Sequence, residues 1–214
     1  MNRINYQKEL EKILATQPAS RERGETLFLH SCCAPCSSYV LEYLCRYFAI
    51  TVFYFNPNIS FREEYGKRVE EQKRLIDAYN KEKRGFPIQI AEGDYKPELF
   101  YETAKGYEDC PEGGERCLRC FELRLRETAE KARKGGYDYF GTTLTISPLK
   151  NADKINEIGR NLSGEYGVAW LPSDFKKKEG YKRSVELSAQ YGLYRQDYCG
   201  CAFSKAERDR RREV

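Results

Sequence analysis

Short apolar runs typical of buried strands alternate along the chain with segments in which apolar residues recur every three or four positions, as on one face of a helix. This pattern predicts five strands, at 26–31, 50–55, 86–91, 137–142 and 168–171. It predicts helices at 6–14, 37–48, 61–84, 97–105, 117–134, 147–162 and 181–191. Strands that alternate with helices in this way indicate an α/β fold, a three-layer, mostly parallel, Rossmann-like (HUP-like) sheet flanked by helices.

The length of 214 residues suits a single α/β domain over 1–214. We expect its core at about 26–192, preceded by an N-terminal helical segment (1–25) and followed by a C-terminal tail (193–214). No stretch approaches the roughly 20 apolar residues that span a bilayer. Residues 1–23 are polar and lack the apolar region of a secretory signal. We therefore expect a cytoplasmic protein that does not enter membranes.

Polar and sulfur-containing side chains follow the predicted strands. The first strand leads into Cys32, Cys33 and Cys36, and the segment after the third carries Cys110, Cys117 and Cys120. Because the carboxyl ends of parallel strands form one edge of a sheet, these six cysteines should converge there, where ligands bind in such folds.

The nine cysteines of a cytoplasmic chain indicate metal or redox chemistry rather than structural disulfides. Cys117 and Cys120 lie three residues apart at the start of a helix, so both sulfurs should face one side. The helix N-terminus, Arg116 and Arg119 should favour their thiolate forms. Cys45, within an apolar helical pattern, is interpreted as a small buried hydrophobe.

Cys32 and Cys33 combine with Cys117 and Cys120 into a four-thiolate set, which fits tetrahedral zinc or an iron–sulfur cluster. Adjacent cysteines favour the cluster, because they can reach separate iron corners. Cys36 and Cys110 remain, either as ligands of a second metal ion or as packing residues. His30 at a strand end is interpreted as a structural residue, although a part in proton transfer stays open.

Cys199-Gly200-Cys201 is a different arrangement, because its spacing closes only into a strained and therefore easily reduced disulfide. We interpret the pair as a dithiol that carries two electrons, or as further metal ligands. For this pair to reach the other cysteines, residues 193–198 must bring the chain back to the same edge.

The net charge of +4 resides in the C-terminal part of the chain. Residues 170–214 hold 11 basic and 7 acidic side chains, whereas the rest is balanced. The basic runs at 176–178, 182–183 and 208–212 are either solvated surface or a footprint for the RNA backbone. No glycine-rich phosphate loop is present, so tightly bound nucleotide is not expected.

Five motifs in order resemble the QueH family of epoxyqueuosine reductases over about residues 27–201. They are His30–Cys36 (HSCCAPC), Tyr54–Ile59 (YFNPNI), Cys117–Cys120 (CLRC), Thr142–Lys150 (TTLTISPLK) and Tyr194–Cys201 (YRQDYCGC).

The resemblance implies reduction of an epoxide on a modified guanine in tRNA, the last step of queuosine biosynthesis. It implies a [4Fe-4S] cluster on Cys32, Cys33, Cys117 and Cys120, and a redox-active pair at Cys199 and Cys201. Some members of the family have Asp where Cys36 stands, and that position would serve a second, mononuclear metal ion such as iron.

The expected partners are the tRNA anticodon arm, held by the basic C-terminal stretch, and an electron donor that the sequence does not identify. Tyr54, Tyr181 and Trp170 are candidates for stacking on its bases. Two alternatives remain open at this point: a zinc-stabilised RNA-binding module without catalysis, and an ATP-dependent tRNA thiolase on a related fold.

Overall fold

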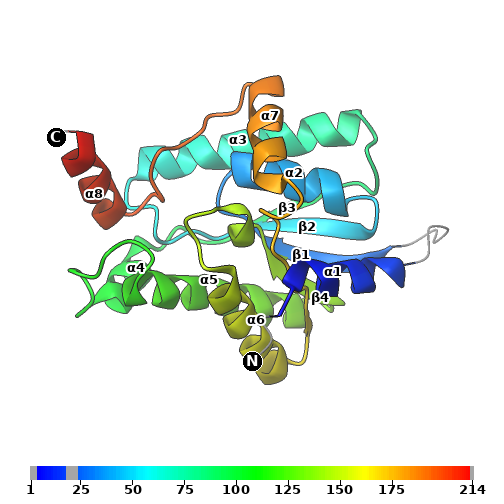
Figure 1. Ribbon diagram of the computed structural model, residues 1–214, viewed down its shortest axis with the longest axis horizontal. Helices are drawn as coiled ribbons and strands as arrows, with labels where there is room; N and C mark the ends of the chain where they lie inside the picture. Colours follow the sequence, from blue (N-terminus) through cyan, green and yellow to red (C-terminus); the bar gives the residue numbers. More distant parts are fainter. Residues whose placement is uncertain (1–3, 18–23, 213–214) are drawn as a thin grey trace.

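The computed structural model describes residues 4–17 and 24–212; residues 1–3, 18–23 and 213–214, which belong to the predicted N-terminal segment and tail, lie outside this description. Its centre is a parallel sheet of five strands in the order β3-β2-β1-β4-β5 (Figure 1). The strands are β1 (Glu25–His30), β2 (Phe48–Tyr54), β3 (Gln89–Glu92), β4 (Tyr139–Thr142) and β5 (Ala169–Trp170). The α/β fold predicted from the sequence is confirmed.

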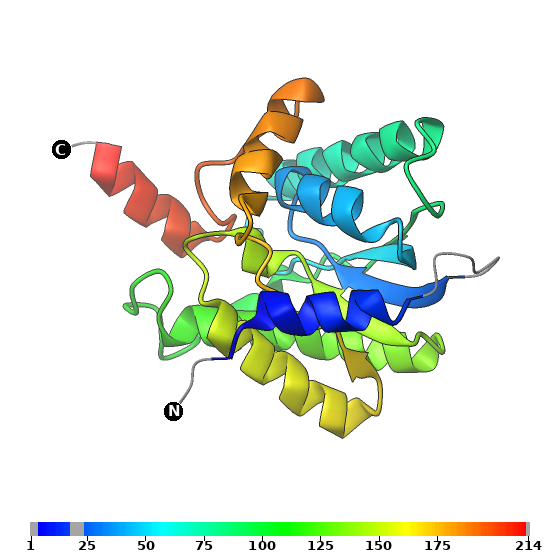
Figure 2. The same ribbon diagram turned by 45° about the vertical axis from the view of Figure 1, so that its right-hand side comes forward.

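Helices cover both faces of the sheet, as Figures 1 and 2 show. On one side are α1 (Tyr6–Ala15), α2 (Ala34–Leu44), α3 (Arg62–Lys81) and α7 (Gly180–Gln190). On the other are α4 (Pro97–Ala104), α5 (Glu115–Lys134) and α6 (Ala152–Tyr166). The chain changes face after β3, so the strand order reverses between β1 and β4. This switch point is where parallel α/β sheets bind their ligands.

The central strand β1 shows why the sheet is buried on both faces. Leu27 and Leu29 belong to the apolar cluster beneath α2 and α3, whereas Phe28 belongs to the cluster beneath α5 and α6. Successive side chains of a strand point to opposite faces, so an uninterrupted apolar run satisfies both layers. Among the described residues, no helix is both long and apolar enough to cross a membrane.

Two predicted helix boundaries were wrong for local reasons. Helix α2 begins at Ala34 rather than at residue 37, because Pro35 fits the first turn of a helix that follows the extended Cys33. It ends at Leu44 rather than at residue 48, because Phe48 already pairs with Glu25 in the sheet.

The segment after β4 also differs from the prediction. Ser147-Pro148 does not open a helix: a short 3₁₀ turn, η1 (Leu144–Ile146), precedes it, and α6 begins only at Ala152. The side chain of Asn151 accepts a hydrogen bond from the backbone N–H of Lys154 and caps that helix. Residues 147–150 are thereby left as a turn at the carboxyl edge of the sheet.

The C-terminal tail contains a helix that was not predicted from the sequence, α8 (Ala202–Arg212). It begins directly after Cys201 and lies at the same end of the molecule as α4 (Figure 1). Phe203 packs beside Phe100 of α4, and the Arg116 guanidinium lies over the Phe203 ring at 4.6 Å. Phe203 thus provides the apolar packing of a mostly charged helix, which an ion pair between Arg116 and Glu207 also holds.

Candidate thiol redox site

The loop after β1 gathers three thiols. The sulfurs of Cys32, Cys33 and Cys36 all lie within 4.8 Å of one another, an arrangement that could hold a metal ion. Cys33 precedes α2 in extended backbone and Cys36 lies in the first turn, so a single chain reversal brings the three together. The Cys32 sulfur is also 3.9 Å from the Thr143 hydroxyl, which follows β4. The cysteine triad therefore lies at the switch point.

The three thiols of the triad do not ionise alike. Hydrogen bonds from Cys33 and Cys36 lower the pKa of Cys32 well below its usual range. The same interaction with Cys32 raises the pKa of Cys33 to about 12 and also raises that of Cys36. The three neighbouring thiols therefore differ in how readily they lose a proton, and a bound metal would displace the protons that remain.

Buried hydrogen bonds to the backbone of the loop after β1 hold the triad in place. The Ser37 hydroxyl donates to the Cys33 carbonyl at 3.0 Å, and the Asn56 amide donates to the Ser31 carbonyl at 2.8 Å. His30 is fully buried and both ring nitrogens have partners: Nε2 donates to the Phe55 carbonyl and Nδ1 accepts from Thr142. Burial lowers the pKa of His30 to about 3, so it is neutral. This agrees with its interpretation as a structural residue.

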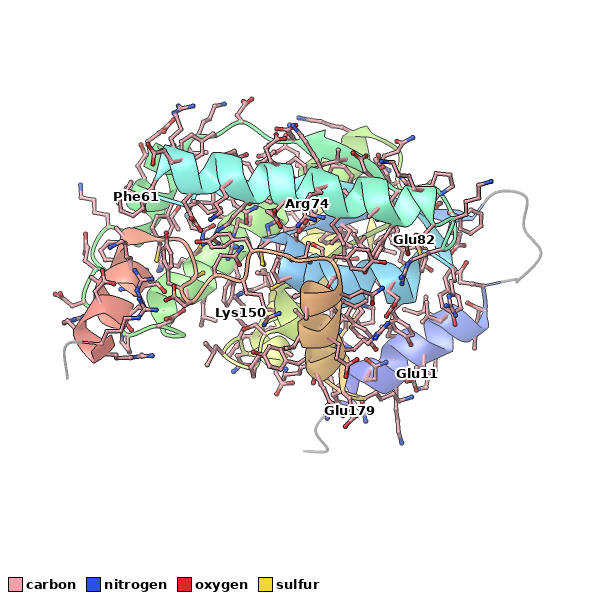
Figure 3. All side chains as sticks on the ribbon, turned by 90° about the horizontal axis from the view of Figure 1, so that it is seen from above. Glu11, Phe61, Arg74, Glu82, Lys150 and Glu179 are labelled. Carbon is pink, nitrogen blue, oxygen red and sulfur yellow. The ribbon has the colours of Figure 1, made fainter. Side chains whose placement is uncertain are left out.

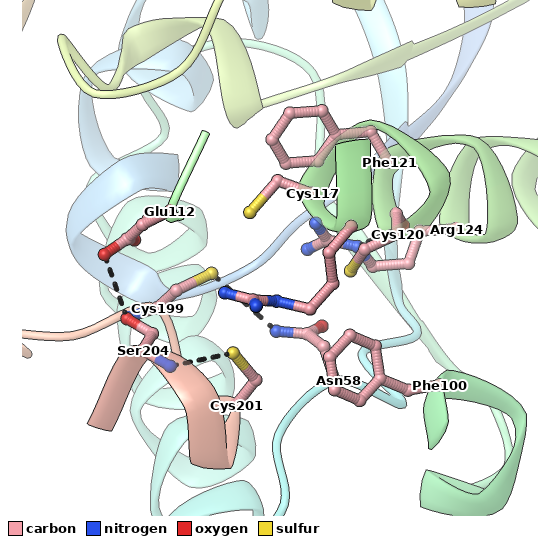
Figure 4. Close-up of a pocket in the computed structure, with 11 residues that line it drawn as sticks. Asn58, Phe100, Glu112, Cys117, Cys120, Phe121, Arg124, Cys199, Cys201 and Ser204 are labelled. Carbon is pink, nitrogen blue, oxygen red and sulfur yellow. Dashed lines mark hydrogen bonds between the residues drawn. The ribbon is translucent and has the colours of Figure 1, made fainter. Parts of the chain in front are cut away.

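A second group of four thiols lines a neighbouring cavity (Figure 4). Cys117 and Cys120 point into it from the first turns of α5, as their spacing predicted, and Cys199 and Cys201 face them from the segment before α8. The Asn58 amide donates to the Cys199 sulfur at 3.9 Å, and the Ser204 backbone N–H donates to that of Cys201 at 3.3 Å.

Burial works against the expectation that Cys117 and Cys120 favour the thiolate form. Burial raises the pKa of Cys117 and raises that of Cys120 to about 11. Arg119 does not help, because its guanidinium bonds to the Tyr107 hydroxyl at 2.7 Å on the exposed side of α5. Burial likewise raises the pKa of Cys201, to about 12. A bound metal ion would favour the thiolate forms of these cysteines, because it displaces their protons.

Side chains of α3 bind the chain at both ends of the linker 193–198 and so direct it back to the site, as the Cys199–Cys201 motif requires. Arg74, labelled in Figure 3, donates to the carbonyls of Tyr191 and Gly192 at 2.8 and 3.0 Å. Two turns earlier on α3, the buried Arg68 donates to the Cys199 carbonyl at 3.0 Å. The predicted return of the chain is confirmed, and it depends on two arginines that belong to none of the five motifs.

A groove of about 510 Å³ joins the two thiol groups. Cys32, Cys33 and Cys36 line it together with Cys199, which lines the four-thiol cavity as well. Lys150 also lines this groove and lies between α7 and α8 in the view of Figure 3. Burial acts to lower the pKa of Lys150, but the neighbouring Cys32 and Cys199 outweigh it and raise that pKa. The groove is therefore both cationic and rich in sulfur.

The surroundings of the thiols fit an anionic sulfur-bound centre. Arg124 is buried and hydrogen bonds to the Cys120 carbonyl and to Asn56, yet its Nη2 has no partner. The Nε of Arg116 and the Oδ1 of Asn58, both lining the four-thiol cavity, are unpartnered too. Unpartnered cationic donors beside clustered thiols suit thiolates with a metal between them, since buried charges need compensation. Arg124 is one helical turn from Cys120, a spacing the sequence already contained.

Three residues that the sequence suggested as ligands or stacking partners lie elsewhere in the molecule than expected. Cys110 lines neither of the two cavities, and its carbonyl accepts a hydrogen bond from Arg116. Tyr54 and Trp170 are buried in the core, so they were wrong candidates for stacking on RNA bases. Cys45 is a buried core residue, as predicted.

The basic runs of the C-terminal part differ in whether they lie at the groove or on the ordinary surface. Lys176, Lys178 and Arg183 form ion pairs with Asp174, Glu11 and Glu42, respectively, and are ordinary surface. The run at 208–212 behaves differently, because three of its arginines line the groove: Arg208, Arg211 and Arg212. Together with Arg195, these arginines are the C-terminal cations that line the groove with the thiols, among the described residues.

A parallel Rossmann-like sheet with seven cysteines on two adjoining cavities defines the class: an α/β protein whose switch point is built for sulfur-based metal or redox chemistry. Comparison with known proteins then identifies the family. The sequence profile of "Epoxyqueuosine reductase QueH" matches residues 27–207. The chain belongs to the QueH family, which is a family of oxidoreductases.

Curated relatives agree along nearly the whole chain. The chain is 46% identical to "Epoxyqueuosine reductase QueH" of Staphylococcus epidermidis, over 94% of this chain and 85% of the relative. It is 43% identical to the protein of the same name from Streptococcus pyogenes, over 94% and 78%. The Thermotoga maritima protein is 39% identical over 86% and 92%. The resemblance inferred from the five motifs is therefore confirmed.

Proposed function

We propose that this chain reduces the epoxide of epoxyqueuosine in tRNA and so forms queuosine. The observation that carries the proposal is membership in the QueH family over residues 27–207, a range that includes every thiol of both cavities. The chemistry of the groove agrees with it. Removing an epoxide oxygen requires two electrons and two protons at one place, and the groove brings thiols together with the ammonium group of Lys150.

For the cofactor, Cys32, Cys33, Cys117 and Cys120 would hold a [4Fe-4S] cluster. The unpartnered nitrogens of Arg116 and Arg124 support an anionic group at this position. Cys36 is the better candidate for a second, mononuclear metal, because it shares the triad, whereas Cys110 lines neither cavity. When bound, the cluster supplies single electrons and an open metal position supplies a Lewis acid.

Cys199 and Cys201 would carry the electron pair. As their disulfide forms, the two thiols lose two electrons and two protons; the epoxide takes up both and becomes an alkene and water. The reduced pair is then restored by an external electron donor of unidentified nature. Gly200 suits this exchange because its positive φ of 119° turns the chain tightly between the two cysteines.

The tRNA would enter along the groove. Among the described residues, six cationic side chains line the groove, against two carboxylates, those of Glu112 and Asp197. The cations are Arg68, Lys150, Arg195, Arg208, Arg211 and Arg212. An excess of positive charge around a recessed reactive centre attracts a polyanion and orients it toward that centre.

The direct test is reduction of tRNA that contains epoxyqueuosine by anaerobically purified protein supplied with a chemical reductant. Mass spectrometry of the digested tRNA should show the modified nucleoside losing one oxygen atom. A protein with bound iron that leaves the nucleoside unchanged would contradict the proposal.

The redox pair has its own test. The double variant Cys199→Ser, Cys201→Ser should keep its iron and lose repeated turnover, by about 10-fold or more, since electron resupply becomes limiting. Undiminished repeated turnover in this variant would remove Cys199 and Cys201 from the mechanism while leaving the reductase activity itself in place.

A further inference from the structure

One rim of the groove carries apolar side chains that the fold leaves in solvent. Leu149 is 75% exposed in the turn after η1, and Tyr181 is 41% exposed in the first turn of α7. Both line the groove that contains the triad. Val185, one helical turn beyond Tyr181 on α7, is 40% exposed. Exposed apolar side chains gathered beside a reactive site mark a binding surface rather than ordinary packing.

Cations without carboxylate partners flank this apolar rim. The Arg195 guanidinium lies 5.8 Å from the centre of the Tyr181 ring and donates to the Ser188 hydroxyl at 3.0 Å. Among the described residues, no carboxylate lies within ion-pair distance of Arg195 or of Lys150. By contrast, Arg208 and Arg212 across the groove both pair with Asp197. The charge free to bind a new anion is therefore concentrated at the apolar rim.

We infer that Leu149 and Tyr181 form a stacking platform for the unpaired base next to the nucleotide being reduced, with Arg195 binding the phosphate between the two. This inference rests on the proposed function and specifies which part of the tRNA the groove holds. An aromatic ring with a guanidinium beside it is the common means of holding single-stranded nucleic acid.

The dimensions of the site favour an unpaired loop over a duplex. The groove of about 510 Å³ is the size of a site for one small molecule, and the thiols lie along it rather than on an open face. A base within a helix cannot bring its substituents so close to the thiols, so the reacting nucleotide must leave the stack. Its neighbour then loses a stacking partner, which the ring of Tyr181 replaces.

Binding of an anticodon stem-loop RNA to the anaerobically purified holoprotein tests the inference. A fluorescent RNA without the epoxide reports affinity alone, by anisotropy at fixed salt. Tyr181→Ala should raise Kd by about 10-fold and Leu149→Ser by about 3-fold, through lost stacking and lost apolar contact. Tyr181→Phe, which keeps the ring, should regain the affinity lost in Tyr181→Ala.

A matched control distinguishes this platform from exposed aromatic residues in general. Tyr101 on α4 is 44% exposed and lies outside the groove, so Tyr101→Ala should leave Kd unchanged. With Arg195→Gln, the slope of log Kd against log salt should fall by about 0.7, the value for one lost contact to single-stranded RNA.

Three results would overturn the inference. They are an unchanged Kd in Tyr181→Ala, an equal loss in Tyr101→Ala, or wild-type binding to anionic phospholipid vesicles with no preference for RNA. If wild-type protein reduces epoxyqueuosine in tRNA while Tyr181→Ala binds RNA normally, the platform is wrong and the proposed function stands. If the variants weaken RNA binding as expected but no reduction occurs, the platform stands and the proposed function fails.

Discussion

The two groups of thiols are assembled in different ways. The triad of Cys32, Cys33 and Cys36 comes from five consecutive positions, and one strand-to-helix turn is enough to form it. The four-thiol cavity needs two segments about 80 residues apart, the start of α5 and the residues before α8. The first group is a property of local sequence, whereas the second depends on tertiary contacts that bring a tail back across α3.

This difference affects what each group can contribute. The triad rests on buried hydrogen bonds at the switch point, so its sulfurs are fixed by the core of the domain. Cys199 and Cys201 lie on a segment without regular structure and are held by side chains from other elements. A rigid group suits a permanent ligand set, and a group on a tethered segment suits residues that change partners during a redox cycle.

The largest effect should follow from breaking the ligand set that joins the two groups. Cys117→Ser should lose most of the bound iron, on the order of 10-fold or more, together with reductase activity, because a cluster held by three thiolates is labile. Iron analysis of anaerobically purified protein measures this. Cys110→Ser, seven residues earlier in the chain and outside both cavities, is the control and should retain iron. Equal loss in the two variants would show that the cavity does not define the ligands.

A smaller effect, on stability, should follow from removing the hydrogen bonds by which α3 holds the returning C-terminal tail. Arg68 is buried and donates to the part-buried Cys199 carbonyl, so Arg68→Met should remove that hydrogen bond and the ion pair with Glu64. The expected cost is about 1–3 kcal/mol, or about 3–10 °C in Tm for a domain of this size. The half-exposed Arg74 also holds the returning chain, but water can replace its hydrogen bonds, and Arg74→Met should cost below about 1 kcal/mol.

Thermal unfolding followed by circular dichroism compares these two arginine variants. Equal shifts in Tm for Arg68→Met and Arg74→Met would mean that burial of the anchor does not decide how firmly the tail is held.

An effect smaller than that of Arg68→Met should come from the turn between Cys199 and Cys201. Gly200 has a φ of 119°, and a Cβ there would lie 3.0 Å from Ile59 and 3.2 Å from the Arg68 guanidinium. Gly200→Ala should therefore lower stability by about 1–2 kcal/mol. Gly192, with a φ of 56° and open space around its Cα, is the matched control and should cost about 1 kcal/mol. The prediction fails if Gly192→Ala is the more damaging of the two.

Much of the fold was predictable because its signals are local. The apolar runs located all five strands, and the spacing of Cys117 and Cys120 placed both sulfurs on one side of α5. The ends of α2 were not predictable from periodicity, because Phe48 continues the helical pattern but pairs with Glu25 in the sheet.

The site was predictable as a set of cysteines but not as an electrostatic environment. Arg68, Arg116 and Arg124 occupy helices whose sequences carry many charges, so nothing local distinguishes these buried arginines from their exposed neighbours. Helix α8 was missed because only Phe203 provides a large apolar contact. Tyr54 and Trp170 were misjudged because composition does not reveal which aromatic residues reach the surface.

We propose that the two groups of thiols jointly hold an iron–sulfur cluster. Iron and acid-labile sulfide analysis of the anaerobically purified wild-type protein, with its visible absorbance spectrum, tests this most directly. We expect brown protein with broad visible absorbance and about four iron and four sulfide per chain, or somewhat more iron if the second metal site is filled. Colourless protein that contains zinc and no sulfide would contradict it.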